Sequence, residues 1–476
     1  MSFEIAVPEG WHLVKLSDLG EVNRGKSKHR PRDAAVLYGG KYPFIQTGDV
    51  KASNGRITSF NQTYSDEGLK QSRLWPAGTM CITIAANIAE TGILQFPACF
   101  PDSVIGFIAD KSKCDVYFVE YMFRLLKSKI KAQANGSVQD NINLQTLERI
   151  LFPIPDLDVQ KNISKTLGAF DDLIIKNSNI NETLEQMAQA LFKSWFVNFE
   201  PVKAKMAVLE AGGSQEDATL AAMTAISGKN ADALAVFERE HPEQYAELKA
   251  TAELFPLAMQ DSELGEIPEG WTLSEIGAQI DIAGGATPST KTPDFWDNGD
   301  IHWTTPKDLS NVKDKILLHT ERKITKAGLG KISSGLLPVN TVLMSSRAPV
   351  GYLAIAKVPV AINQGYIAMK CNKELSPEFV LQWCSANMPE IISRASGTTF
   401  AEISKKNFNP IPLVKPPLEL VKNYTKQVSA IYSLIENTMR ENNSLTELRD
   451  TLLPKLLSGE ITLPEAEQAV SEVENV

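Results

Sequence analysis

The 476-residue sequence lacks several features that would place it in a specialised class of proteins. Its five cysteines are odd in number and contain no C-x-x-C pair, which argues against a disulfide framework and against a zinc ribbon. No apolar run reaches the roughly 18 residues of a membrane-spanning helix, and an acid stands where a signal peptide needs bases. We therefore expect a cytoplasmic chain with no membrane association.

Motifs of catalysis are also missing. The sequence has no complete phosphate-binding loop, no H-E-x-x-H and no G-x-S-x-G, and its five histidines are scattered. Asp294, Glu321 and Lys323 fit the carboxylates and lysine of metal-dependent nucleases only loosely, and so loose a pattern often arises by chance. We expect a chain that is not an enzyme on its own and that binds neither a metal nor a cofactor.

The net charge of −9 does not exclude an anionic partner once the charges are located. Residues 203–261 carry ten acids and five bases, and residues 459–476 carry five acids and no base. These two segments carry −5 each, which leaves +1 for the rest of the chain. That part includes a basic run without an acid, formed by Arg24, Lys26, Lys28, Arg30 and Arg32. Such a run is a possible contact for nucleic acid.

The chain repeats itself once, with a period of about 260 residues. Residues 7–11 (VPEGW) return as residues 267–271 (IPEGW), and residues 74–79 (LWPAGT) are echoed by residues 336–341 (LLPVNT). A tandem duplication of a globular unit is the simplest explanation.

Each globular copy is predicted to be a mixed α/β domain with more strand than helix. Short apolar runs such as residues 80–84 and 341–344 are typical of strands bounded by turn residues. One helix is predicted in each copy, around residues 116–131 and 377–392.

The composition divides the chain into segments. We assign residues 1–157 to the first globular domain and residues 263–415 to the second. Residues 201–262 are acidic and rich in alanine, which indicates either a helical insert or a loosely ordered linker, and residues 459–476 form an acidic tail.

A long heptad pattern follows each copy, over residues 158–200 and 416–458. Seam residues alternate at gaps of four and three from Ile163 to Trp195, and the same register returns from Tyr424 to Leu456. The pattern predicts two helices of roughly 60 Å, at 1.5 Å per residue, that pair as an antiparallel coiled coil. The alternative is that each helix lies alone on the core of its own copy.

The middle of both seams is polar. Asn181 and Asn442 occupy seam positions there, and buried asparagine in a coiled coil fixes the register at a cost in stability. We predict that these two residues set the register, with Asn177 and Thr438 close by.

Polar side chains suited to phosphates and base edges gather in loops and at strand ends of both copies. In the first copy they are Arg24, Lys26, Lys28, Arg30, Gln46 and Thr47. In the second copy they are Thr287, Ser289, Thr290, Lys291, Thr304, Thr305, Lys307, Ser345, Ser346, Arg347, Asn363 and Gln364. Each loop alone could be a solvated turn, but their recurrence in both copies favours binding of DNA.

Several of these stretches resemble one known family. Residues 285–289 (GATPS), 299–303 (GDIHW) and 305–309 (TPKDL) are similar to the start of a target-recognition domain in the specificity subunit of type I restriction-modification enzymes. In the first copy, residues 42–49 (YPFIQTGD) and 136–142 (GSVQDNI) resemble another variety of that domain.

The two copies differ within this resemblance. The second has Phe400 and Glu402 where the first has Gln139 and Asn141. Residues 345–347 (SSR) stand where the first copy has residues 83–85 (TIA). Such differences are expected of two domains that read different DNA sequences.

The resemblance implies a non-catalytic, sequence-specific subunit that binds double-stranded DNA and reads a bipartite, asymmetric target, with the helix pair as a ruler between the two domains. It implies two modification subunits, which carry S-adenosylmethionine and adenine methylation, and restriction subunits, which carry ATP, Mg²⁺ and cleavage. The alternative function is a duplicated coiled-coil adaptor that binds proteins instead of specific DNA.

Overall fold

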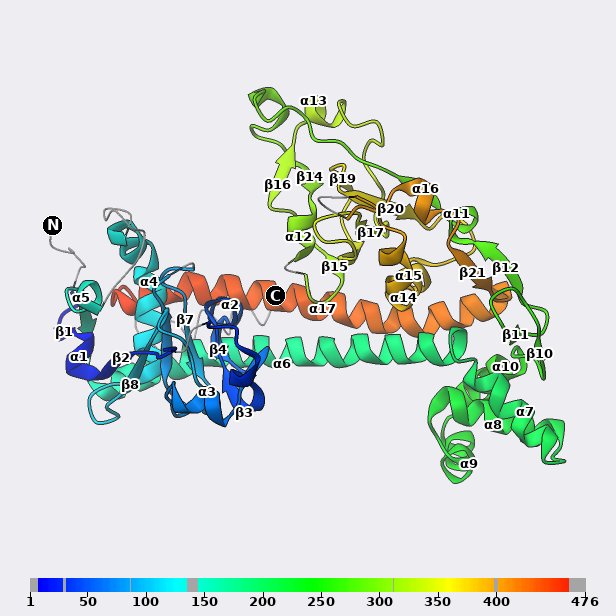
Figure 1. Ribbon diagram of the computed structural model, residues 1–476, viewed down its shortest axis with the longest axis horizontal. Helices are drawn as coiled ribbons and strands as arrows, with labels where there is room; N and C mark the ends of the chain where they lie inside the picture. Colours follow the sequence, from blue (N-terminus) through cyan, green and yellow to red (C-terminus); the bar gives the residue numbers. More distant parts are fainter. Residues whose placement is uncertain are drawn as a thin grey trace. The chain divides into compact units, whose positions relative to one another are not determined.

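The structure is a computed structural model that describes residues 7–28, 31–85, 87–134, 144–310, 312–397 and 401–461 (Figure 1). Arg30, Gln139, Asn141, Phe400 and the tail from residue 462 lie outside the described residues. The chain divides into two compact units, Met1–Asn177 with Arg440–Val476, and Ser178–Met439.

The first unit is built on a five-stranded sheet. In order across the sheet, its strands are β2 (Gly20–Arg24), β8 (Val104–Ala109), β6 (Met80–Thr83), β7 (Thr91–Leu94) and β4 (Gly55–Ile57). Neighbouring strands run antiparallel except for β7 and β4, which are parallel. The same unit holds the pairs β3 (Tyr38–Phe44) with β5 (Gln62–Tyr64) and β1 (His12–Lys15) with β9 (Leu151–Ile154), and the helix α4 (Val116–Ala134).

The second unit repeats this plan. The order across its five-stranded sheet is β13 (Asp281–Ala283), β20 (Tyr366–Lys370), β17 (Val342–Ser345), β18 (Leu353–Ala356) and β15 (Ile316–Leu317). Each strand occupies the place of its counterpart in the first unit, and the last pair is again parallel. The predicted duplication and the mixed α/β fold class are therefore confirmed.

One of the smaller sheets of the second unit has one strand more than its counterpart in the first. A three-stranded sheet has the order β16 (Arg322–Ile324), β14 (Ile301–Thr304) and β19 (Val360–Ile362), and β12 (Thr272–Glu275) pairs with β21 (Pro412–Lys415). The single helix predicted over residues 377–392 is instead two, α14 (Pro377–Ala386) and α15 (Met388–Ser393). Pro389 has no backbone N–H to continue the helical ladder, which explains the interruption.

Two 40-residue helices are the longest elements: α6 (Leu157–Phe196) and α17 (Leu418–Leu457). All predicted seam residues are buried or half-buried. In the first unit Leu167 of α6 and Leu452 of α17 share one hydrophobic core, and in the second unit Trp195 and Tyr424 share another. The start of α6 thus packs with the end of α17, and the end of α6 with the start of α17. Within each unit the two helices run antiparallel, as predicted.

The register prediction needs one correction. Asn442 is bonded to Asn177, whose Nδ2 donates to Asn442 Oδ1 at 3.0 Å and to Glu441 Oε2 at 3.0 Å. Asn181 is fully buried beside the carboxyl group of Asp314 instead. In an antiparallel pair, positions related by the duplication cross over, so the residue opposite Asn442 is Asn177.

The predicted insert, residues 201–262, is occupied mainly by four further helices, of which the first begins one residue earlier: α7 (Glu200–Glu210), α8 (Gln215–Ser227), α9 (Ala231–Glu240) and α10 (Pro242–Glu253). Met223, Leu234 and Ala252 form a small core among them. The composition left open a helical insert or a loosely ordered linker, and the segment is a helical insert. No helix in the described part of the chain is long and apolar enough to cross a membrane.

Candidate nucleic-acid interface

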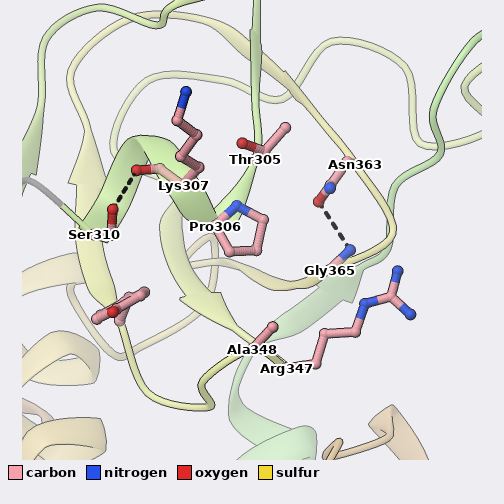
Figure 2. Close-up of a pocket in the computed structure, with 9 residues that line it drawn as sticks. Thr305, Pro306, Lys307, Ser310, Arg347, Ala348, Asn363 and Gly365 are labelled. Carbon is pink, nitrogen blue, oxygen red and sulfur yellow. Dashed lines mark hydrogen bonds between the residues drawn. The ribbon is translucent and has the colours of Figure 1, made fainter. Parts of the chain in front are cut away.

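The second unit has an open pocket at the end of β14, shown in Figure 2. Its volume is about 430 Å³. Four of the predicted residues line it: Thr305, Lys307, Arg347 and Asn363. They come from the short helix α12 (Pro306–Ser310) with the residue before it, the loop after β17 and the loop after β19. The strand ends thus bring together residues that lie up to 58 positions apart in the sequence.

A carboxylate fixes the entry into α12. The Thr305 backbone N–H and hydroxyl both donate to Asp308 Oδ2, at 2.7 and 2.9 Å, and the Glu321 backbone N–H donates to Asp308 Oδ1 at 2.8 Å. At the end of the neighbouring strand β19, Asn363 Oδ1 accepts from the Gly365 backbone N–H at 2.9 Å. The pocket therefore has a preformed polar rim.

Both cations of the pocket lie on its exposed side and face carboxylates. Lys307 Nζ is 2.8 Å from Glu321 Oε2, and this hydrogen bond raises the pKa of Lys307. Arg347 Nη1 is 3.7 Å from Glu402 Oε2. Exposed ion pairs of this kind are weak, so a phosphate can take the place of either carboxylate. The arrangement suits contacts to DNA phosphates and base edges.

A second group of predicted residues meets on the loop before β14. Thr287 Oγ1 donates to Gln364 Oε1 at 2.7 Å, which orients the exposed amide of Gln364. The loop reaches this position because Gly285 lies against β19, where a Cβ atom would be only 1.9 Å from the carbonyl oxygen of Ile362. Ser289, Thr290 and Lys291 are exposed on the same loop.

Three predicted contact residues are instead buried. The hydroxyl of Thr304 bonds to that of Tyr366 at 2.9 Å, and Ser345 Oγ donates to the Pro349 carbonyl at 2.7 Å. Ser346 is also buried. β17 lies in the middle of its sheet with both faces covered, so polar residues at its end point into protein. The Thr304 and Ser345 hydroxyls are thus engaged inside the protein, and the buried Ser346 Oγ has no hydrogen-bond partner among the described residues. None of the three lies at the surface, where the prediction of direct DNA contacts expected them.

Only part of the basic run of the first unit is free to contact DNA. Arg24 Nε and Nη2 donate to the Asp102 carbonyl at 3.0 and 2.8 Å, and Arg32 pairs with the Asp102 carboxylate at 2.9 Å. Lys26 and Lys28 are exposed. Asp102 lies about 70 positions away in the sequence, so a basic run without internal acids still acquires an acidic neighbour by folding.

The end of β3 in the first unit corresponds to the pocket rim in the second. The Gln46 backbone N–H donates to Asp49 Oδ2 at 2.7 Å, as Thr305 does to Asp308. Thr47 follows, half-buried, as the first residue of α2 (Thr47–Ala52). The two helices α2 and α12 thus begin in the same way, on Asp49 and Asp308.

Two polar neighbours of Gln46 escaped the sequence-based prediction. Asn61 Nδ2 donates to Asp49 Oδ1 at 2.7 Å, and Gln62 Oε1 accepts from Gln46 Nε2 at 2.6 Å. In the second unit Arg322 was also missed; its guanidinium lies 3.6 Å from the centre of the Trp296 ring. The sequence offered one signal of this corner of the fold: both copies carry an aspartate near the start of a short helix, Asp49 in α2 and Asp308 in α12.

The described residues contain no group of three or more His, Cys, Asp or Glu side chains that could hold a metal ion. The loops thus offer cations, amides and hydroxyls on two copies of one scaffold, the combination expected of a DNA-binding chain.

The chain belongs to the family described as the type I restriction modification DNA specificity domain, whose sequence profile matches residues 8–186 and 268–447. This membership favours sequence-specific DNA binding over the protein-adaptor alternative.

Known relatives carry the same designation. The HindI specificity subunit of Haemophilus influenzae is 32% identical over 372 residues, which cover 75% of this chain and 80% of the relative. The putative MjaX specificity subunit of Methanocaldococcus jannaschii is 25% identical over 469 residues, covering 96% and 94%. The crystal structure of a type I S subunit from M. genitalium matches with 15% identity and a TM-score of 0.48, over 96% and 98% of the two chains. The helical insert lies in the stretch that separates the two family matches.

Proposed function

We propose that this chain reads a bipartite, asymmetric DNA target, one half-site per unit, with a fixed nonspecific gap between the half-sites. The proposal rests chiefly on the presence of two units with one strand order and different polar side chains at corresponding positions. Thr305 stands where the first unit has Gln46, and both precede a short helix held by an aspartate. Two copies of one fold that present different side chains at corresponding positions are expected to bind different base sequences.

The proposed partners follow from the family. Two modification subunits would carry S-adenosylmethionine and methylate adenine, and restriction subunits would carry ATP, Mg²⁺ and the cleavage activity. This chain would bind double-stranded DNA in the cytoplasm, direct both reactions to the target, and hold no cofactor itself.

Mapping of methylated adenines in cells that contain this chain and its modification subunits tests the proposal. The expected result is one motif made of two dissimilar blocks at a constant separation, absent when the gene for this chain is deleted. A single continuous palindrome would refute the bipartite reading.

A further inference from the structure

Two exposed glutamine side chains of the first unit are bonded to each other. Gln46 Nε2 donates to Gln62 Oε1 at 2.6 Å. Each glutamine is also fixed through its main chain: the Gln46 N–H binds Asp49, and Gln62 lies opposite Phe44 in the β3–β5 ladder. The backbone therefore aims both amides at the same place on the surface, where an exposed amide–amide bond contributes little to stability on its own.

The bond leaves a defined set of free hydrogen-bonding groups. Gln46 Oε1, which also faces the Asp49 backbone N–H in the capping box of α2, keeps a second lone pair as an acceptor, and Gln62 Nε2 remains a donor. In the major groove, adenine presents the complementary pair, the N6 amino donor and the N7 acceptor, whereas guanine presents two acceptors. An acceptor and a donor held side by side therefore favour adenine over guanine.

One exposed aromatic side chain lies close to Gln62 in the sequence. Phe60, two residues before Gln62, is 43% exposed, and its ring packs edge-on against Phe96 with 5.3 Å between the centroids. A large exposed apolar side chain of this kind suits the methyl group of thymine, which pairs with adenine. Phe60 is therefore a suitable apolar contact for the thymine of an A·T pair.

The amide pair lies at the position that corresponds to the pocket of the second unit. Gln46 corresponds to Thr305, which lines the pocket of Figure 2, because both donate a backbone N–H to the aspartate that starts a short helix. The same corner of the scaffold therefore carries polar groups in both units, an amide pair in the first and a rim with two cations in the second.

From these observations we infer that the Gln46–Gln62 amide pair reads an adenine in the first half-site through the major groove. The inference rests on the proposed function and names the base contact at one end of the first unit. Gln62 is the more informative residue to change, because it supplies the free donor and its exposed side chain is not needed by the core.

The test is selection of bound sequences from a library of randomised duplex DNA by the full chain, purified with the modification subunits of its own complex. We expect wild-type protein to select two blocks of bases, one of which contains an adenine that Gln62→Ala loses by about tenfold in preference. Gln62→Glu replaces the donor by an acceptor, and the preference at that position should move towards cytosine, which presents an amino donor. The other block should not change in either variant.

A matched control is Gln244→Ala, an exposed glutamine of the insert, which should leave both blocks as in the wild type. Unchanged adenine preference in both Gln62 variants would overturn the inference while the proposed function stands. Absence of any sequence preference in the wild-type complex would overturn the proposed function and the inference together.

Discussion

The two units bury polar clusters of different chemistry at corresponding positions of the same fold. In the first, Asp171 of α6 accepts from Tyr121 of α4 at 2.6 Å and pairs with Arg449 of α17 at 2.5 Å. In the second, Tyr432 of α17, 261 positions after Asp171, donates to Glu185 of α6 at 2.7 Å. Both clusters tie a recognition domain to the two long helices. Duplication has kept the place of this connection and not its chemistry.

The first cluster is the more strongly charged. Burial alone raises the pKa of the Asp171 carboxyl, but Arg124, Tyr121 and Arg449 outweigh burial and hold this pKa below its usual range. In the second cluster the Tyr432 hydroxyl, whose pKa burial raises far above its ordinary value, bridges Glu185 and Gln382 as a neutral group. The first unit therefore depends on charge balance, and the second on a hydroxyl and an amide together with one lysine, Lys315.

The largest effect is expected from Asp171→Ala. The change removes the buried carboxylate that Arg449 and Arg124 share, which leaves Arg124 with Glu120 and Arg449 with only the exposed Asp450. Breaking a buried ion pair on one side typically costs about 3–5 kcal/mol. Unfolding in urea should show this loss, which the matched variant Asp172→Ala should not, because the Asp172 side chain is 75% exposed. Equal losses in the two variants would show that the cluster contributes nothing special.

A smaller loss, about 1–2 kcal/mol, is expected from Tyr432→Phe in the second unit. The change removes the bridging hydroxyl, but Gln382 Nε2 still donates to Glu185 Oε1 at 3.1 Å, so Glu185 keeps a partner. Tyr245→Phe, at a half-exposed tyrosine of the insert, is the control in the same urea experiment. A loss as large as that of Asp171→Ala would contradict the difference drawn between the clusters.

The asparagine pair of the first unit provides a third prediction. Replacing Asn177 and Asn442 together with Leu removes a seam hydrogen bond and adds apolar burial, so thermal stability should rise, by about 1 kcal/mol, while the register becomes less well defined. The single variant Asn177→Leu should be less stable than the double variant, because it leaves Asn442 without its partner. If the double variant is instead the less stable, the pair does not lie in the seam.

The pH dependence of stability should differ between two buried or half-buried carboxyls, and this effect is the smallest in size. The pKa of Asp171 is lowered, so its stabilisation is complete above the unfolded value of about 3.9 and is lost as pH falls through the folded value. The pKa of Asp314 is raised, mainly by burial and also by Glu185, so its contribution is lost as pH rises. Asp314→Asn should therefore increase stability at neutral pH and not at pH 3. Urea unfolding at both pH values measures this, and a gain at pH 3 alone would contradict it.

Much of the fold could be predicted because periodicity and repetition are local properties of the sequence. The seam from Ile163 to Trp195 and its copy from Tyr424 to Leu456 predicted both long helices and their pairing. The repeat predicted two domains of one fold. The break at Asn387 was missed because a single Pro389 near the end of an apolar pattern marks a boundary only weakly.

The candidate site was predicted less completely, because side-chain contacts depend on residues distant in the sequence. Asp102 binds Arg24 and Arg32, although it lies 78 and 70 positions away in the sequence, and no local pattern predicts this contact. Ser345 is hydrophilic and ends a strand, yet that strand is central and covered on both faces. Gln62 has no unusual neighbours in the sequence and becomes a candidate only because the β3–β5 pairing places it beside Gln46.

If each unit recognises its own half-site independently, a change confined to the second unit should affect only one half-site. Mapping methylated adenines after Arg347→Ala tests this most directly. One block of the target should change or become less specific, while the other block keeps its bases. A change in both blocks, or in neither while methylation persists at the original target, would contradict it.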